Sequence, residues 1–179
     1  LELPKSATMS LAVMEHDGSP AAGYSAGIRV RDYYIPFADS GTGSLTMKVS
    51  RGSEPTRVEV NLPRLGATIK RDALVGDGLA LDYTLPARHV VDLTMLDQTG
   101  RPVTAASSVA VTGVTRVASD AGPVDVRTTL SADGDSRGRG QLTLPTMDNA
   151  DFLLTTAGLS GNAENVAITG DRSIVLQSG

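Results

Sequence analysis

One short segment of this chain has the residue pattern of a hydrolase nucleophile. Gly23-Tyr24-Ser25-Ala26-Gly27 fits Gly-x-Ser-x-Gly, in which a strained turn between a strand and a helix presents the serine. That chemistry also needs an acid and a histidine further along the chain. No helical pattern follows Ser25, and the only later histidine is His89. A loop of small residues therefore explains the segment better than a nucleophile does.

A second segment, Asp39-Ser40-Gly41-Thr42, resembles the catalytic loop of aspartic proteases. Those enzymes need two aspartates that share one proton. The related segment Asp135-Ser136-Arg137-Gly138 lacks the motif, so a second copy of the chain would have to supply the other aspartate. The favoured interpretation is a turn that leads into a strand at Leu45.

Oxygen and nitrogen ligands for metals are sparse. Ser131, Asp133 and Asp135 could offer oxygens to calcium, but a calcium loop uses six or more oxygens and often a bidentate glutamate, and no glutamate lies nearby. His16 and His89 are isolated, and the absence of cysteine excludes thiolate sites, disulfides and cysteine nucleophiles. We therefore expect no catalytic residue, no cofactor and no metal site, with calcium near Asp133 and Asp135 left open.

Aromatic residues gather at one place only. The chain has no Trp, four Tyr and two Phe, and Tyr33, Tyr34 and Phe37 lie close together in the sequence. Exposed, these side chains would form a patch for a protein or glycan partner. Turned into the core, they would serve packing alone. Both interpretations stay open at this stage.

The elements that must position these residues are β-strands. Apolar residues alternate with polar ones at Val58, Val60 and Leu62, and again at Val91, Leu93 and Met95, as in strands with one buried face. Gly and Pro recur about every 8–15 residues, which is typical of a β-sandwich. No helical period is free of Gly or Pro. The range 65–74 comes nearest, as a short helix or an irregular strand.

The chain nearly repeats itself. Leu3-Pro4 returns as Leu85-Pro86, and Asp17-Gly18-Ser19-Pro20 returns as Thr99-Gly100-Arg101-Pro102. A repeat at this spacing indicates two copies of one module. We therefore predict two tandem antiparallel β-sandwiches, residues 1–86 and residues 87–179. A short connection at Pro86-Ala87-Arg88 joins them, and their cores contain Leu45, Leu81, Leu93 and Leu142.

The second copy carries the extra length in its middle loop, from about Gly113 to Gly138. Val124, Val126 and Thr128 alternate with polar residues inside this insertion. We therefore expect part of it to form an added edge strand or hairpin, with residues 133–138 as an exposed loop.

Charge and hydropathy exclude two classes of partner. The net charge is −4 with both signs interspersed, and there is no basic patch for nucleic acid. No apolar run approaches the ~18 residues that a membrane-spanning helix needs. The opening Leu1-Glu2-Leu3-Pro4 is similar to the junction segment Tyr83-Thr84-Leu85-Pro86, so we expect a piece of a longer protein.

The second copy resembles a carboxypeptidase regulatory-like, or transthyretin-like, domain. The range Val91–Ala106 has the apolar strand followed by acidic-x-x-Gly-x-Pro-Val, and Val109-Ala110-Val111 follows as a second strand. Asp133–Leu144 and residues 170–176 are also similar to that family. The first copy departs from the pattern at Ala21-Ala22-Gly23. The resemblance implies Ig-like sandwiches that serve as accessory modules, usually extracellular and usually without catalysis.

A related family, the collagen-adhesin B-type repeats, can form an internal Lys–Asn isopeptide bond. Residues 87–179 contain no lysine and cannot form one. Lys5, Lys48 and Lys70 leave that chemistry open in the first copy alone.

These inferences lead to one functional hypothesis and one alternative. The first is a non-catalytic structural or adhesive spacer of a larger bacterial protein, secreted or at the cell surface, whose partners are the neighbouring domains of the same chain. The alternative is an accessory module, attached to a secreted enzyme, that binds a carbohydrate or peptide. The lack of Trp favours the spacer.

Overall fold

The structure is a computed structural model of the chain and describes residues 6–30, 32–39, 44–50, 55–74 and 79–179. In this part of the chain every regular element is a strand except the 3₁₀ turn η1 (Pro63–Leu65). The predicted all-β class is therefore confirmed. No helix among the described residues is long and apolar enough to cross a membrane.

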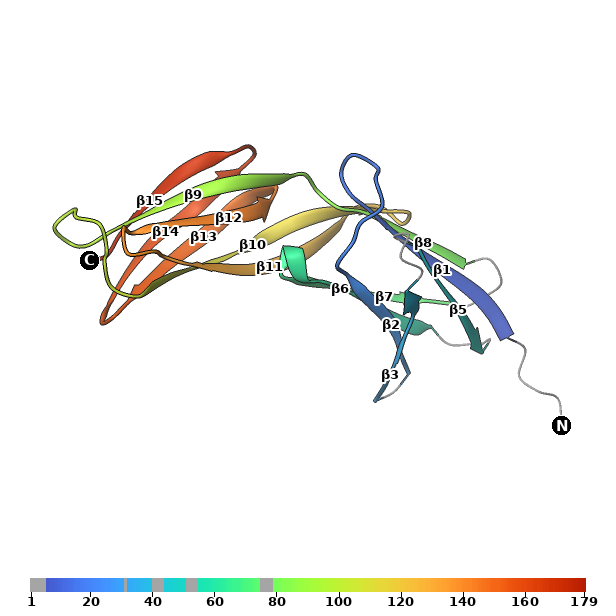
Figure 1. Ribbon diagram of the computed structural model, residues 1–179. Helices are drawn as coiled ribbons and strands as arrows, with labels where there is room; N and C mark the ends of the chain where they lie inside the picture. The colour runs from blue at the N-terminus through green and yellow to red at the C-terminus, as the bar shows by residue number, and fades with distance from the viewer. Residues whose placement is uncertain (1–5, 31, 40–43, 51–54, 75–78) are drawn as a thin grey trace. The chain divides into compact units, whose positions relative to one another are not determined.

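Residue contacts divide the chain into two compact units. Unit 1 comprises Leu1–Leu85 together with Val117–Val124, and unit 2 comprises Pro86–Arg116 and Asp125–Gly179. Each unit contains strands from two sheets (Figure 1). The first unit therefore includes a short segment that the repeat pattern assigns to the second copy.

Unit 1 is built from the strands that precede residue 85. One sheet has the order β3-β2-β6-β7, and the other has the order β8-β1-β5-β4. Their bounds are β1 (Ser6–Met14), β2 (Ser25–Val30), β3 (Tyr33–Pro36), β4 (Ala38–Asp39), β5 (Ser44–Ser50), β6 (Thr56–Leu62), β7 (Ala67–Ala73) and β8 (Leu79–Thr84). Residues 67–73 thus form a regular strand rather than a helix.

Unit 2 is built mainly from seven later strands. One sheet has the order β12-β9-β15, and the other contains β14, β13 and β10, with β11 on the free side of β10. Their bounds are β9 (Arg88–Leu96), β10 (Ser107–Ser119), β11 (Val124–Asp133), β12 (Arg139–Pro145), β13 (Met147–Thr156), β14 (Leu159–Ile168) and β15 (Arg172–Gln177). The strand predicted from Val124, Val126 and Thr128 is confirmed as β11.

Most strand pairs are antiparallel, as expected, but each unit has one parallel pair. β1 pairs with β8 in parallel, and β9 pairs with β15 in parallel. In both units the pair joins the first and the last strand of the repeat. Sequence alternation specifies which residues face inward and leaves the direction of a neighbouring strand unspecified, so the antiparallel expectation missed these pairs.

The cores follow the predicted alternation. Leu81, Leu93 and Leu142 are buried as expected, while the side chain of Leu45 lies outside the described part. In unit 2, inward residues of both sheets form one apolar cluster, which includes Leu93, Phe152 and Ile174. This packing removes apolar surface from water, the main driving force for folding.

The long β10–β11 hairpin reaches beyond the unit in which it begins. At its tip, Ala118 and Ser119 of β10 pair with Thr84 and Tyr83 of β8. Through these two residue pairs, the strands follow one another in the hydrogen-bonded order β14-β13-β10-β8-β1-β5-β4. Part of the predicted insertion thus serves as an edge strand of unit 1.

Candidate functional site

The solvent face of the β3-β2-β6-β7 sheet carries three pairs of polar side chains that bond to each other, Arg29–Glu59, Arg57–Asp72 and Asn61–Thr68. Strand alternation turns every second residue outward on this face. The inward residues of the same strands are apolar and buried, among them Ile28, Val58 and Ile69. The outward ones include Ser25 and Arg29 of β2, Arg57, Glu59 and Asn61 of β6, and Thr68, Lys70 and Asp72 of β7.

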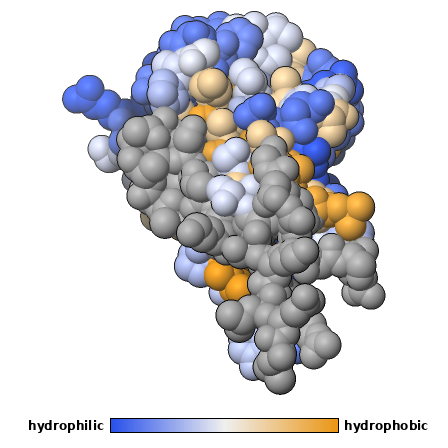
Figure 2. Space-filling view, turned by 90° about the vertical axis from the view of Figure 1, so that its right-hand side faces the viewer, coloured by the Kyte–Doolittle hydropathy of each residue, from blue (hydrophilic) through white to orange (hydrophobic). Residues whose placement is uncertain are grey.

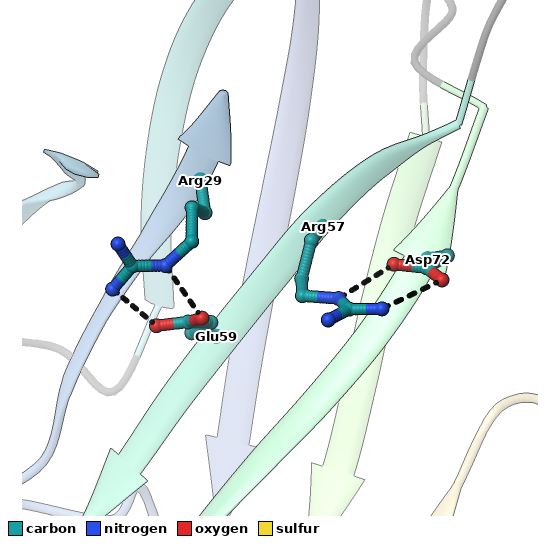
Figure 3. A network of polar contacts seen from close by, with 4 residues as sticks. All are labelled: Arg29, Arg57, Glu59 and Asp72. Carbon is teal, nitrogen blue, oxygen red and sulfur yellow. Dashed lines mark hydrogen bonds and ion pairs between the residues drawn. The ribbon is translucent and has the colours of Figure 1, made fainter. Parts of the chain in front are cut away.

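Two ion pairs order the middle of this face. Arg29 and Arg57 stand directly opposite each other across β2 and β6, and like charges so placed repel. Each guanidinium turns to a carboxylate instead (Figure 3). Arg29 donates to Glu59 through Nε at 2.9 Å and Nη2 at 3.2 Å. Arg57 donates to Asp72 at the same two distances.

The electrostatics of the two pairs follow from this geometry. The hydrogen bonds from Arg29 lower the pKa of Glu59, and those from Arg57 lower the pKa of Asp72. The side chains of Arg57 and Asp72 are about half exposed, at 50% and 54%. Solvent screens this exposed pair, so it contributes little to folding. Their main effect is to fix the side-chain positions on the face.

Gly27 makes room for the ring of Tyr34. A Cβ atom at Gly27 would lie 2.5 Å from Cζ of Tyr34 and 2.7 Å from the carbonyl oxygen of Ile35. Only glycine fits beneath the ring at this distance. The guanidinium carbon of Arg29 lies 5.7 Å from the ring centroid, within the range of a cation–π contact. Burial raises the pKa of Tyr34, and the nearby charge of Glu59 raises it further.

Beside Tyr34 the face is hollowed. This open hollow has a volume of about 350 Å³, and we call it the sheet basin. Two of its lining side chains are bonded to each other, since the Thr68 hydroxyl donates to Oδ1 of Asn61 at 3.3 Å. The described residues that line it are Ser25, Arg29, Tyr34, Glu59, Asn61 and Thr68.

The predicted aromatic patch does not share one surface. Tyr33 is 76% exposed and Tyr34 is 42% exposed, whereas Phe37 is buried in unit 1. Along β3 the side chains alternate, so Tyr34 faces the basin while Tyr33 and Ile35 point to the other side of the sheet. Of the three aromatic residues, Tyr34 alone lines the basin.

Ser25 lies within strand β2 and not at a turn into a helix. In the register, Asn61 is its partner on β6. His16 is exposed in a turn, and Nε2 of His89 lies 2.9 Å from the Thr146 hydroxyl in unit 2. The described residues therefore hold no histidine next to Ser25. The side chain of Asp39, in β4, lies outside the described part.

The acidic residues considered for calcium have structural roles in unit 2. Oδ1 of Asp135 accepts hydrogen bonds from the backbone N–H groups of Arg137 at 2.8 Å and Arg139 at 2.9 Å. These bonds lower the pKa of Asp135 and close the turn into β12. Asp133 is exposed at the end of β11. Among the described residues no group of three or more His, Cys, Asp or Glu side chains could hold a metal ion.

The lysines considered for an isopeptide bond are also placed in part. Lys70 is exposed on β7, opposite Glu59 in the register. Lys5 and the side chain of Lys48 lie outside the described part.

A second polar cluster in unit 1 was not predicted from the sequence. Asp120, at the tip of the β10–β11 hairpin, accepts two hydrogen bonds from Arg71 of β7, at 2.7 Å and 3.0 Å. Its Oδ1 also accepts the backbone N–H of Asp82 in β8 at 3.0 Å. Asp120 thus bonds to both sheets of unit 1. No local pattern signals a contact between residues 49 positions apart.

This cluster is better shielded from water than the Arg57–Asp72 pair on the open face. The side chains of Arg71 and Asp120 are 23% and 30% exposed. The hydrogen bonds from Arg71 lower the pKa of Asp120. Below them, burial raises the pKa of Tyr83, which the neighbouring Arg71 partly opposes. We call Arg71, Asp82 and Asp120 the tip clamp.

Among the coloured, described residues on the face drawn in Figure 2, no large apolar region is visible. Hydrophobic residues appear there as separate spots among hydrophilic ones. Monomeric proteins normally expose single apolar residues in this way.

Comparisons with known proteins give little further information. A scan against protein families finds no match, and a search of curated proteins finds none. Among solved structures, the Bacillus anthracis TIE protein has a TM-score of 0.38 at 13% identity, over 97% of this chain and 34% of that one. A streptococcal ancillary pilin has a TM-score of 0.42 at 14% identity, over 97% and 62%.

A minor pilin of Streptococcus agalactiae has a TM-score of 0.47 at 10% identity, over 96% of this chain and 95% of that one. The chain spans about a third of the length of the TIE protein and about three fifths of the length of the ancillary pilin. At these low identities and TM-scores, the likeness carries no argument about what this chain does.

Proposed function

We propose that the chain is a non-catalytic structural spacer of a larger extracellular protein, and that its two units resist tension applied along the chain. One observation carries this proposal. In each unit the first and the last strand of the repeat pair side by side in parallel. The partners are then the neighbouring domains of the same chain, and the location is a secreted protein or a cell surface.

Parallel pairing determines how a pull along the chain loads the hydrogen bonds. β1 and β8 are in register from Met9–Leu79 to Met14–Thr84, and β9 and β15 from Val91–Arg172 to Leu96–Gln177. The chain enters such a pair at one end and leaves it at the other. Tension therefore slides the two strands past each other and strains all bonds of the ladder together. In an antiparallel hairpin pulled from its open end, the bonds break one at a time.

Buried side chains on the same strands add to this resistance. Leu11 on β1 and Leu81 on β8 stand opposite each other in the register and are fully buried. In unit 2, Leu93 on β9 and Ile174 on β15 have the same relation. Sliding would pull these side chains out of the core, at about 1.5–3 kcal/mol for each one exposed to water.

Three features of the described residues support a role without catalysis. Ser25 has no neighbouring histidine, the Asp135 carboxylate bonds to a turn, and the carboxylates of Glu59 and Asp72 bond to arginines. A hydrolase would need a nucleophile, a base and a group that orients the base in one place. The extracellular location rests on the resemblance to carboxypeptidase regulatory-like domains.

Single-molecule pulling tests the proposal. The chain has no cysteine, so paired cysteine substitutions give unique attachment points. Handles appended to the two chain ends load the parallel pairs in shear. Handles at Asp148→Cys and Ala167→Cys load the antiparallel β13–β14 pair from its open end. We expect a clearly higher unfolding force with the terminal handles. Equal forces in the two geometries would contradict the proposal.

A further inference from the structure

We infer that the sheet basin of unit 1 is a binding site for a short neutral saccharide. This inference goes beyond the proposed spacer function and does not depend on it. It rests on three properties of the lining: cancelled charge, neutral hydrogen-bonding groups, and an aromatic ring held in place.

The charges in the basin cancel. Among the described residues of its lining, Arg29 and Glu59 are the only charged side chains, and they bond to each other in a bidentate pair. An anionic or cationic ligand would have to compete with this internal partner. A ligand without charge can bond to the positions that the pair leaves open, since a carboxylate accepts at about four sites and a guanidinium has five donors.

The remaining polar groups suit a molecule that is rich in hydroxyls. Ser25 and Thr68 each offer a hydroxyl, which donates and accepts, and Asn61 offers an amide that does both. Neighbouring hydroxyls on a sugar ring also donate and accept, at a spacing that planar amide, carboxylate and guanidinium groups match. Asn61 and Thr68 are already bonded to each other, so this edge of the basin is ordered before a ligand arrives.

Tyr34 supplies the apolar contact that a sugar ring needs. Its ring lies over Gly27, the Arg29 guanidinium lies over the ring, and 42% of the residue remains exposed. Aromatic rings combine a large apolar area with few rotatable bonds, and the contacts with Gly27 and Arg29 restrict those bonds further. Such preorganisation lowers the entropy cost of binding.

The size of the basin favours a mono- or disaccharide. Its volume of about 350 Å³ is near the lower end of the range for ligand sites, about 300–1,000 Å³. A peptide strand is less suited to this hollow. It would be expected along the exposed strand β3, where Tyr33 and Ile35 point away from the basin.

Titration of the full 179-residue chain, labelled with ¹⁵N and followed by NMR, tests the inference. The probes are maltose, cellobiose and N,N′-diacetylchitobiose, with a short blocked peptide of alternating threonine and valine as the competing class. For at least one disaccharide we expect saturable shifts of the amide signals of Ser25, Gly27, Glu59, Asn61 and Thr68. The open, shallow site predicts dissociation constants in the millimolar range.

Variants separate the basin from its surroundings. Tyr34→Ala should weaken binding roughly tenfold, since it removes the aromatic contact. Tyr33→Ala is the matched control, because it removes the neighbouring exposed ring on the opposite side of the strand, and it should leave binding unchanged. Gly27→Ala should weaken binding with Tyr34 still present, since the added Cβ displaces the ring. Tyr34→Phe should retain the fold and most of the affinity.

Four outcomes would overturn the inference. They are the absence of shifts with all three disaccharides up to their solubility limits, shifts from the peptide alone, disaccharide shifts centred on Tyr33 and Ile35, and equal losses in Tyr33→Ala and Tyr34→Ala. The pulling experiment remains independent, because Tyr34→Ala leaves both parallel strand pairs in place and should not change the unfolding force.

Discussion

Units 1 and 2 use the same corner after their first strand. In unit 1, Glu15 N–H donates to the Ser19 carbonyl at 2.7 Å and Gly18 N–H donates to the Glu15 carbonyl at 3.0 Å. In unit 2, Asp97 bonds to Arg101 and Gly100 bonds to Asp97 at the same distances. Gly18 and Gly100 have φ angles of +84° and +80°, which favour glycine. The repeated residues therefore encode a repeated local geometry.

The units differ in how they complete their sheets. Unit 2 relies on one apolar cluster drawn from both of its sheets. Unit 1 carries two ion pairs on an open face and bonds to the tip of the β10–β11 hairpin through Asp120. The comparison shows that part of the insertion in the second copy, Val117–Val124, belongs structurally to unit 1. It also places the two arginine–carboxylate pairs of the open sheet face and the tip clamp in unit 1.

The largest expected effect comes from creating a cavity in the core of one unit at a time. Leu93→Ala should destabilise unit 2 by about 2–5 kcal/mol, because a fully packed leucine leaves a cavity when it is truncated. Leu11→Ala, at the corresponding position of the first repeat, should do the same to unit 1. Amide hydrogen exchange by NMR reports each unit separately.

In Leu93→Ala, protection should fall in β9, β12 and β15 and remain in β2, β6 and β7. Leu153→Ala on the exposed side of β13 is the control and should change little, since Leu153 is 49% exposed. Equal loss of protection in both units would show that they unfold as one.

The next effect tests whether the hairpin tip belongs to unit 1. Asp120→Ala removes the acceptor of Arg71 and of the Asp82 N–H. A partly buried donor left without its acceptor costs about 1–3 kcal/mol. We therefore expect unit 1 to lose stability, although residue 120 lies in the second copy of the repeat. Hydrogen exchange in β7 and β8 measures the loss.

Asp125→Ala is the matched control for this change. Asp125 pairs with Arg116 near the same hairpin tip, but both side chains are mostly exposed, at 59% and 68%. Such a pair contributes about 0.2–1 kcal/mol at most. If Asp120→Ala destabilised unit 2 instead, the assignment of Val117–Val124 to unit 1 would be wrong.

Much of the fold could be predicted from the sequence, because strand signals are local. Period-two alternation identified the buried faces at Val58, Val60, Leu62 and Leu93, and the alternation after Val124 identified β11. These patterns depend on neighbours in the chain and on burial of one face. The parallel pairing of β1 with β8 depends on residues about 70 positions apart, and no local pattern encodes it.

The candidate site shows the same limit. Gly-x-Ser-x-Gly drew attention to Ser25, which lines the basin, and to Gly27, which contacts the Tyr34 ring, but the motif predicts neither position. Ser25 faces outward from a strand, and Gly27 lies beneath the Tyr34 ring. Arg29 and Glu59 are 30 positions apart and meet only when β2 pairs with β6. Residue types suggested the chemistry, and strand register assembled the site.

Low pH should destabilise the two units to different extents. Lowered carboxyl pKa values occur at Asp17, Glu59, Asp72 and Asp120 in unit 1, and at Asp97 and Asp135 in unit 2. A carboxyl whose pKa is lower in the folded state stabilises above its unfolded pKa of about 4, and this contribution is lost as the pH falls through the folded pKa. Unit 1 should therefore lose more stability than unit 2 below about pH 4.

Salt sharpens this test, because the causes of the shifts differ. Glu59, Asp72 and Asp120 bond to arginines, whereas Asp97 and Asp135 bond to hydroxyl and backbone N–H groups within turns. Ions at 1 M reduce the Debye length to about 3 Å and weaken exposed ion pairs. High salt should thus reduce the acid sensitivity of unit 1 more than that of unit 2. Hydrogen exchange at pH 3 and pH 6, with and without salt, measures both effects.

The smallest expected effect concerns the exposed ion pair between β6 and β7. Asp72→Asn keeps the shape of the side chain and removes the charge that Arg57 faces. Solvent screens exposed pairs of this kind, so the direct loss of stability in urea unfolding should be small. Arg57 also stands opposite Arg29, and without Asp72 their repulsion is less well compensated. The loss should therefore exceed that of Asp125→Asn, whose partner Arg116 is not opposed in this way by another arginine among the described pairs. If Asp72→Asn cost no more than Asp125→Asn, the two ion pairs of the basin face would be independent, and the polar face of unit 1 would contribute no more to folding than an ordinary exposed surface.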